Sequence, residues 1–446
     1  MSDLQIYITL GIFAAVILTI AFDVLDMAVA TVLGATVLYA LGILNSRDIE
    51  AAVDTSGGTL ALLFGGMVVA RTLTGTGLFE RIGGGLLRAT GGSGKRFLLL
   101  LIALVAPVCA VLPNATTVIL LAPVIIRVAI ALEIDFVGPI VLTAIISNSA
   151  GLLTLVGDPA TFLVGSSIGM SFGTYLKKVS LGGLLCLLTM VPLLPIVLRD
   201  IWRLRRELPP ADTPRRIERP WFAVLALATL LCMVALFVVG EYLIHPILPP
   251  TAAIIGAALS LLLIYSAKIE PVDNVLRDVD WKTLVFLFAI FCLVQGVTRT
   301  GILQGLALKL QGWFGTDLTI VALVFLGGIG ILSGLLANIP LVAASLLMTK
   351  GYLVATELVP ETALAAGFTG WPAAVIPVFI AMMFGATLGG NATLIGASAN
   401  VAGAGICAAH GKRVSFARFA RYGVPITFCQ LIMAMLYVLA LFRFSG

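Results

Sequence analysis

Residues 153–165 read LTLVGDPATFLVG, and this stretch decides how the surrounding chain must fold. Asp158 and Pro159 interrupt a hydrophobic run in which a carboxylate is costly to bury and a proline breaks a helix. Gly157 permits the backbone to unwind, Asp158 can cap a new helix, and Pro159 suits its first position. The segment 136–174 is also too long for one straight membrane crossing, so the sequence predicts a broken helix there.

The composition predicts an all-α polytopic membrane protein. Of the 446 residues, 60% are hydrophobic and 11% are charged, and the mean hydropathy is +1.13. A soluble domain of this length could not keep so much apolar surface out of water, whereas segments of about 20 apolar residues span a bilayer as helices. The first run lacks a signal-peptide cleavage site, so we interpret it as a retained helix. The predicted spans are 4–22, 27–45, 58–77, 136–174, 178–198, 221–240, 251–267, 283–298, 373–410 and 423–443.

Positive charge in the loops orients these spans. Lysine and arginine gather in the loops 78–97, 199–219, 268–282 and 411–421. The alternate loops, 46–57, 241–250 and 353–372, hold only Arg47. Because cytoplasmic loops are enriched in lysine and arginine, the first set is predicted to be cytoplasmic. The N-terminus is then non-cytoplasmic, and we expect the protein in the inner (plasma) membrane of the cell.

The two halves of the chain resemble each other. Asn114 in LPNATTVILLAP corresponds to Asn338 in LANIPLVAASLL, and Gly77 corresponds to Gly301, both at an offset of 224 residues. Further on, TLVGDPAT from Thr154 matches TLIGASAN from Thr393 at an offset of 239 residues. Three matches in one order indicate a duplication, although helical membrane proteins often show weak self-similarity. The predicted parts are an N-terminal helix at 1–26, a first repeat at 27–198, a cytoplasmic linker at 199–219 and a second repeat at 220–446.

The loop charges place the two repeats in opposite orientations. Inverted repeats are typical of secondary transporters, which bind their substrate near the middle of the membrane between the repeats. The sequence therefore predicts an inverted-repeat transporter, with a second broken helix at 373–410.

Two further segments are interrupted by polar residues. In 97–132, LPNATT leaves two arms of about 15 residues, roughly 22 Å of helix against a hydrocarbon core of about 30 Å. Pro113 cannot donate a backbone hydrogen bond, and Asn114 is a good N-cap for the second arm. We expect a re-entrant hairpin here and another at 319–352, which turns at Asn338; proline-kinked helices are the alternative.

Asp158 and Arg71 are the candidate coupling residues, because an ionisable side chain inside a membrane span is functional by default. Asp158 is predicted to bind a coupling proton or, alternatively, a sodium ion; the structural interpretation is a helix cap alone. Arg71 either extends toward the cytoplasm or pairs with Asp158.

Enzyme and metal chemistry find little support. The six cysteines form no CxxC motif, and there are two histidines, so a disulfide framework, a zinc site or a haem is not expected. No nucleophile–His–acid set appears, and GGSGKR at 91–96 lacks the Walker spacing. We expect no cofactor and no nucleic-acid partner. The expected partners are a small-molecule or ion substrate and the lipid bilayer; an ATPase acting in trans is possible, and a channel is the alternative to a carrier.

Three motifs identify a family resemblance. LPNATTVILLAPV, SNSAGLLTLVGDPATFLVGSSIG and GGNATLIGASANVAGAG resemble the ArsB/NhaD/P-protein branch of the ion transporter superfamily. Its members include arsenite permeases, sodium/proton antiporters, the P protein and, more distantly, citrate and dicarboxylate carriers. The resemblance implies two hairpins, two broken helices, a homodimeric scaffold and an elevator-like transport domain.

The same resemblance implies the site residues. The hairpin tips would contribute Asn114, Thr116, Thr117 and Asn338. The broken helices would contribute Asn148, Gly157, Asp158, Asn391, Thr393, Gly396, Ser398 and Asn400. The second tip, ANIPLV, departs from the Asn-Thr pair of the sodium-coupled dicarboxylate carriers, which argues against a two-sodium mechanism.

These residues favour an uncharged polar substrate. Arsenite is mostly As(OH)₃ at neutral pH, and amides, hydroxyls and helix ends can bind it through hydrogen bonds. The leading hypothesis is therefore proton-coupled efflux of arsenite or antimonite. A sodium/proton antiporter is second, with Asp158 as its single carboxylate. An organic-anion carrier for dicarboxylates or citrate is third, because Arg71 is the only basic candidate.

Overall fold

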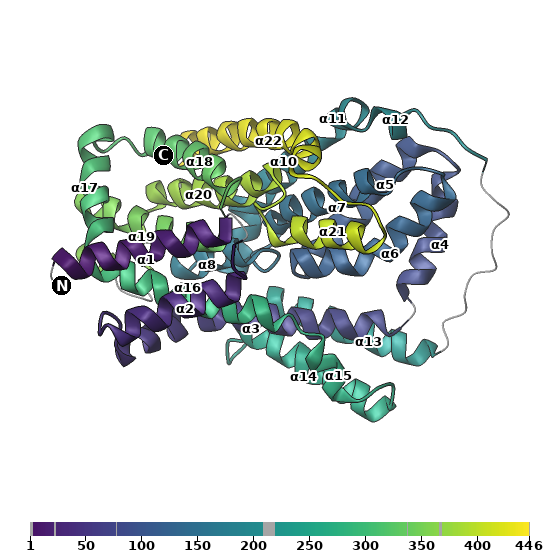
Figure 1. Ribbon diagram of the computed structural model, residues 1–446, viewed down its shortest axis with the longest axis horizontal. Coiled ribbons are helices and arrows are strands. Elements are labelled where there is room, and N and C mark those ends of the chain that lie inside the picture. The colour runs from purple at the N-terminus through teal and green to yellow at the C-terminus, as the bar shows by residue number, and fades with distance from the viewer. Residues whose placement is uncertain are drawn as a thin grey trace.

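The computed structural model describes residues 3–21, 24–76, 78–207, 219–336, 338–364 and 368–445, and these are built of helices (Figure 1). Ten helical segments of this part of the chain are long and apolar enough to cross a membrane. The prediction of an all-α protein with many membrane spans is thus confirmed. Gly77 of the predicted repeat, and most of the predicted linker, lie outside the described residues.

The helices of the first half include all of the predicted spans, with further helical segments in two predicted loops. They are α1 (Asp3–Ala21), α2 (Met27–Ala40), α3 (Ser46–Thr74), α4 (Leu78–Thr90), α5 (Gly94–Cys109), α6 (Asn114–Ala131), α7 (Val137–Ala150), α8 (Pro159–Ser167), α9 (Phe172–Tyr175), α10 (Leu181–Leu188), α11 (Met190–Val197) and α12 (Arg199–Trp202). The segments predicted as 97–132 and 136–174 each appear as two successive helices joined by a short turn.

The second half repeats this order of helices. It contains α13 (Pro220–Val239), α14 (Pro249–Ala267), α15 (Val272–Arg277), α16 (Trp281–Arg299), α17 (Ile302–Phe314), α18 (Leu318–Ser333), α19 (Asn338–Ala355), α20 (Ile376–Gly389), α21 (Ser398–Ala409) and α22 (Phe416–Ser445). The pair α18–α19 corresponds to α5–α6, and the pair α20–α21 corresponds to α7–α8.

The helices form two groups that lie along the long axis of the molecule (Figure 1). In the first group, α3 packs against α14 and α16, and α2 packs against α16. In the second group, α21 packs against α6 and α7, while α20 packs against α18 and α22. The helices α4 and α17 lie at opposite ends of the long axis (Figure 1).

Two segments predicted as loops, 46–57 and 78–97, form helices instead, and so does 302–318, which corresponds to 78–97 in the second half. The segment 46–57 is the first part of α3, because Asn45 and Asp48 cap it reciprocally, each side chain accepting a hydrogen bond from the backbone N–H of the other residue. The charged segments 78–97 and 302–318 contain α4 and α17. In α4, Ile82 and Leu86 lie one turn apart and give the helix an apolar face, which an interpretation based on charge alone overlooked.

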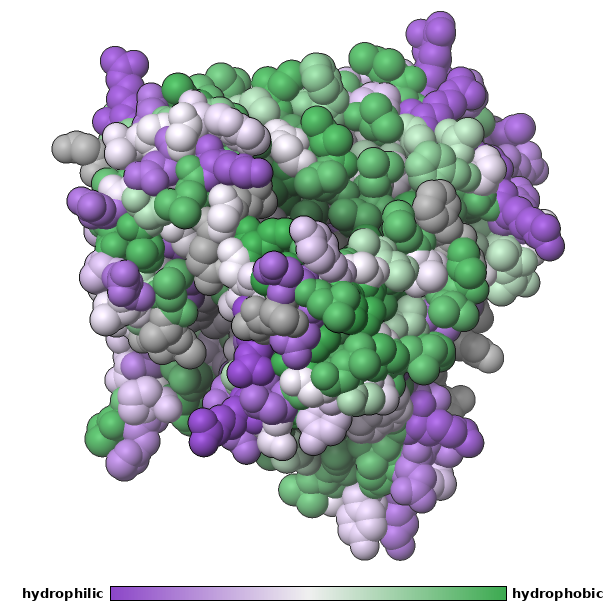
Figure 2. Space-filling view, turned by 60° about the vertical axis from the view of Figure 1, so that its left-hand side comes forward, coloured by the Kyte–Doolittle hydropathy of each residue, from purple (hydrophilic) through white to green (hydrophobic). Residues whose placement is uncertain are grey.

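The outer surface agrees with a membrane environment. Figure 2 shows a face covered largely by hydrophobic residues, with the hydrophilic residues gathered mainly toward its margins. Large apolar side chains are exposed along α13 and α22, including Val224, Leu231, Phe428 and Leu436. Such wide apolar exposure is stable in lipid and not in water.

Candidate functional site

Two helix interruptions form the centre of the molecule. After α7, a 3₁₀ turn at Gly151–Leu153 leads into a second turn at 154–157 and then to Asp158, directly before α8. After α20, a 3₁₀ turn at Gly390–Ala392 leads in the same way to α21. Both broken helices that the sequence predicts are therefore present.

Glycine is required at both interruptions because the backbone folds closely on itself. A Cβ at Gly157 would lie 2.9 Å from the carbonyl oxygen of Gly151. A Cβ at Gly396 would lie 2.5 Å from the carbonyl oxygen of Gly390. Both distances are too short for a real side chain, so these two glycines act by allowing close approach of the backbone.

The two halves tie their interruptions to the neighbouring helix turns through equivalent contacts. The hydroxyl of Thr154 donates to the carbonyl of Ala110, and the hydroxyl of Thr393 donates to the carbonyl of Gly334. The thiol of Cys109 donates to the carbonyl of Ser147 at 2.9 Å. Its counterpart in the second half is the Ser333 hydroxyl, which donates to the carbonyl of Ala386 at 2.5 Å. The donors and acceptors of the two halves are offset by 224 and 239 residues, as in the sequence matches.

Asp158 connects three elements. It occupies the N-cap position of α8, but its side chain makes no cap hydrogen bond. Instead, Asn114 Nδ2 at the start of α6 donates to Oδ1 at 3.3 Å, and Thr387 Oγ1 in α20 donates to Oδ2 at 3.0 Å. The side chain is buried, at 3% exposure. The carboxylate therefore joins the first hairpin turn, the first interruption and a helix of the second half.

Buried amides join the two interruptions to each other. Asn148 Nδ2 donates to Asn400 Oδ1 at 2.9 Å, and Asn400 Nδ2 donates to the carbonyls of Gly390 and Thr393, both at 2.8 Å. These bonds hold the end of α7 against the start of α21. The Oδ1 atom of Asn148 has no hydrogen-bond partner among the described residues, so it remains available as an acceptor.

A second buried network involves a residue that the sequence analysis missed. Asn391 Nδ2 donates to Ser149 Oγ at 2.9 Å and to Gln430 Oε1 at 3.0 Å. Gln430 Nε2 in turn donates to Ser149 Oγ at 2.9 Å. A glutamine inside an otherwise apolar span is a sequence signal that could have identified Gln430, which is fully buried in α22.

A large cavity of about 800 Å³ lies beside the interruptions. It is lined by the first residues of four helices: Asn114 (α6), Pro159 (α8), Asn338 (α19) and Ser398 (α21). Thr116, Asn148 and Asp158 also line it. Asn391, Thr393 and Asn400, also predicted site residues, do not line the cavity; they are buried and form the hydrogen bonds described above. The buried hydroxyl of Thr117 has no hydrogen-bond partner among the described residues.

The wider part of the cavity carries charged residues. Arg71 forms ion pairs with Glu270 at 3.0 Å and with Asp278 at 2.7 Å. The alternative in which Arg71 pairs with Asp158 does not hold in this structure, because the guanidinium pairs with Glu270 and Asp278 instead. Both of these acids lie in the segment that follows α14. Its part in coupling remains a prediction. Lys282 is paired with Asp26.

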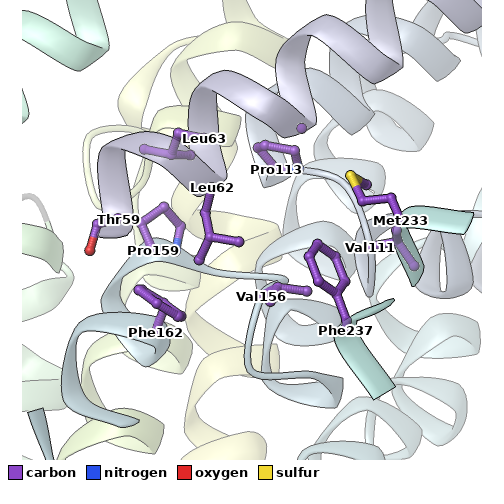
Figure 3. Close-up of a pocket in the computed structure, with 11 residues that line it drawn as sticks. Thr59, Leu62, Leu63, Val111, Pro113, Val156, Pro159, Phe162, Met233 and Phe237 are labelled. Carbon is purple, nitrogen blue, oxygen red and sulfur yellow. The ribbon is translucent and has the colours of Figure 1, made fainter. Parts of the chain in front are cut away.

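Helix α3 closes the opposite side of the first interruption. Figure 3 shows Thr59, Leu62 and Leu63 of α3 and Met233 and Phe237 of α13. They face Val111, Pro113 and Val156 of the two turns, and Pro159 and Phe162 of α8, across a pocket of only about 10 Å³. The contact between the two helix groups is therefore apolar and nearly filled at this point.

The arrangement defines a class of protein: a helical membrane protein with two broken helices facing a polar central cavity. The chain belongs to the family described as citrate transporter, whose match covers residues 15–370. The match confirms a membrane transporter of this family.

Individual relatives agree. An uncharacterized transporter of Synechocystis sp. is 42% identical over 439 residues, which cover 98% of both chains. An uncharacterized transporter of Mycobacterium tuberculosis is 30% identical over 436 residues, or 97% of each chain. The human P protein is 27% identical over 520 residues, covering 98% of this chain and 60% of that protein. The resemblance to the P protein is thus confirmed, and the link to arsenite permeases stays a prediction. These names indicate a transporter and not an enzyme.

Proposed function

We propose that the protein is a secondary transporter for a small organic anion of the citrate or dicarboxylate type. The observation that carries this proposal is the meeting of four helix N-termini at one cavity wall. Each N-terminus carries the equivalent of about half a positive charge, and its first turn leaves backbone N–H groups without an intrahelical partner, except at prolines such as Pro159, which have no N–H. Several such ends together favour carboxylate groups without a fixed cation at the binding position.

The polar side chains of the wall complement these helix ends. The amides of Asn114 and Asn338 and the hydroxyl of Ser398 line the cavity and can donate to carboxylate oxygens. The sequence analysis ranked an organic anion third because Arg71 is the only basic candidate at the site. Helix N-termini and polar donors can bind a carboxylate without a basic side chain, so that ranking no longer holds. The family described as citrate transporter agrees with an organic anion.

The transport movement is proposed to be of the elevator type. The predicted inverted repeat is supported by the equivalent contacts at the two interruptions and by α4 and α17 lying at opposite ends of the molecule (Figure 1). On this proposal, α5–α6 and α18–α19 are re-entrant hairpins. They move with the broken helices along the apolar surface that α3 and α13 present (Figure 3).

Asp158 is proposed to couple transport to a proton, with sodium as the alternative. It is the carboxylate at the first interruption, lines the cavity, and connects both halves through Asn114 and Thr387. Protonation would remove the charge that both donors now stabilise, so it would alter the contact between the hairpin and α20. The buried acceptor atom of Asn148 and the hydroxyl of Thr117 are further oxygens that a coupling ion could use.

Arsenite efflux is the second candidate. It is favoured by the uncharged amides and hydroxyls at the helix ends, which suit a neutral triol. A site of three thiolates is not required for this substrate, and Cys109 is the cysteine that contacts the wall, through Asn114 Oδ1 at 2.9 Å.

Uptake into proteoliposomes distinguishes the candidates. The purified protein is given radiolabelled citrate, succinate or arsenite, with and without an inward proton gradient. We expect saturable uptake of at least one of the two carboxylates. Arsenite uptake alone would replace the proposal by its second candidate. Dissipation of the proton gradient by sodium, with no uptake of the three solutes, would indicate an antiporter and refute both.

A further inference from the structure

Each second arm of the two helix hairpins carries one basic residue. In α6 it is Arg127, thirteen residues after Asn114, and in α19 it is Lys350, twelve residues after the equivalent Asn338. At 1.5 Å per residue, both charges lie roughly 20 Å along the helix from the turn. They therefore occupy nearly equivalent positions in the two halves.

The two residues have opposite environments. Arg127 is exposed and lines the large cavity, and no ion-pair partner is found for it in the described part of the chain. Lys350 is buried, at 5% exposure. Its ammonium lies 3.5 Å from the carbonyl oxygen of Ser167 and 5.5 Å from the ring centre of Trp371, and no described carboxylate pairs with it.

The two residues also lie toward opposite ends of the molecule. Val124, one turn before Arg127, is the side chain nearest to Gly83 of α4. Tyr352, two residues after Lys350, donates its hydroxyl to the carbonyl of Gly315 at the end of α17, at 2.8 Å. Since α4 and α17 lie at opposite ends of the long axis (Figure 1), Arg127 and Lys350 lie toward opposite ends of the molecule.

Packing does not explain a lysine at position 350. An ammonium has three donors, and burying it with one long hydrogen bond and no carboxylate is costly in a membrane protein. The position that corresponds to it at the offset of 224 residues is Ile126, a buried apolar residue. An apolar side chain therefore fills the equivalent position in the other hairpin.

We propose that Arg127 and Lys350 are a pair of anion-attracting residues, one for each side of the membrane. In the conformation seen here, Arg127 stands in the open cavity, and Lys350 is covered on the closed side. When the transporter opens to the other side, Lys350 lines the new cavity and attracts the anion there. This inference rests on the proposed transport of an anion.

Transport measured separately from each side tests this pair. Oriented proteoliposomes are used to determine KM for citrate presented on either side. Arg127→Gln raises KM at least fivefold from the side on which the cavity opens, and Lys350→Met raises it at least fivefold from the opposite side. Lys350→Arg retains the charge and restores KM. The exposed residues Arg88 and Lys177 supply the matched controls Arg88→Gln and Lys177→Met, which leave both values unchanged. An equal effect of Lys350→Met on both sides, or on kcat alone, would show a structural role and overturn the proposal.

Thiol labelling tests the exposure of Lys350 even if citrate is not the substrate. Lys350→Cys and Arg127→Cys are made in a chain in which Cys232 and Cys429, the cysteines that are not buried, are replaced by alanine. A membrane-impermeant anionic methanethiosulfonate is added to one side at a time. We expect each variant to react from one side only, and the two sides to differ. If Lys350→Cys reacts from neither side while Arg127→Cys is fully modified, the proposed opening at Lys350 is wrong. If citrate is not transported but each variant is labelled from one side only, the result would count against citrate as the substrate and not against the proposed opening at Lys350.

Discussion

The replacement Asp158→Asn tests the coupling role of this carboxylate with little change in shape. Thr387 can still donate to the amide oxygen, whereas the bond from Asn114 Nδ2 is lost or must rearrange. A hydrogen bond to a charged group contributes about 1.5–3 kcal/mol. The lost bond is offset in part because the variant no longer buries a charge. We therefore expect a folded protein whose free energy of unfolding changes by no more than about 2 kcal/mol.

The effect on transport is expected to be much larger. A gradient of one pH unit corresponds to about 1.4 kcal/mol per proton, or a tenfold accumulation for each coupled proton. The wild-type protein should approach this value in proteoliposomes, and Asp158→Asn should fall to an accumulation ratio of about one. Exchange of labelled for unlabelled substrate, which needs no gradient, serves as the control for a folded carrier. Tenfold, pH-driven accumulation by the variant would refute the coupling role.

Substitutions at three further positions test individual contacts of the fold. Gly157→Ala places a Cβ 2.9 Å from a backbone carbonyl oxygen, so we expect a loss of stability of about 1–3 kcal/mol, measured from the denaturation midpoint; an unchanged midpoint would contradict the close approach. Gln430→Ala removes one hydrogen-bond partner each from the buried side chains of Asn391 and Ser149, so we expect it to lower the free energy of unfolding by about 1–3 kcal/mol. Gln430→Glu retains the acceptor for Asn391 and should cost less. Partial burial raises the pKa of Asp135, but hydrogen bonds led by Lys412 and joined by Arg418 outweigh it and hold that pKa below its usual value. The stabilisation by Asp135 is therefore full above its unfolded pKa of about 3.9 and is lost as the pH falls through the lower pKa of the folded state. Asp135→Asn should lower the free energy of unfolding by about 0.5–1 kcal/mol at pH 7 and by nothing at the lowest pH. A difference between wild type and variant that is the same at every pH would contradict this assignment.

The sequence was most informative where local chemistry alone determines the backbone. Gly157, Asp158 and Pro159 predicted the first interruption because each residue favours the end of one helix or the start of another, and the structure has α8 begin at Pro159. The second interruption followed from its match to the first. The turn before Asn114 was predicted for the same reason, although Pro113 occupies the N-cap position of α6 and Asn114, the predicted N-cap, is its first helical residue.

The partners of the site residues were beyond local reasoning. Thr387 donates to Asp158 across 229 positions of the chain, and Asn148 donates to Asn400 across 252. Such contacts depend on how the two halves pack, which no local pattern encodes. The ion pairs of Arg71 were missed for the same reason, because its acids lie in a segment that the charge analysis treated only as a loop.

The substrate preference changed because the sequence predicted single helix starts but not how many of them share one cavity. The sequence showed one carboxylate and several amides, which favoured a neutral substrate. In the structure, the first residues of four helices line the same cavity, and on our proposal these N-termini favour an anion without a basic residue.

Direct binding of radiolabelled citrate to the detergent-purified protein tests the central claim most directly, with Asn114→Leu and Ser398→Leu as the variants. Both residues begin helices that line the cavity, and the exposed Lys177→Met serves as the control. Loss of a hydrogen bond to a charged group corresponds to a weakening of about tenfold or more. Saturable binding to the wild type and the control, with Kd raised at least tenfold in both variants, is the predicted result. Binding of unchanged strength in both variants, or no saturable binding to the wild type, would contradict an anion site at these helix ends.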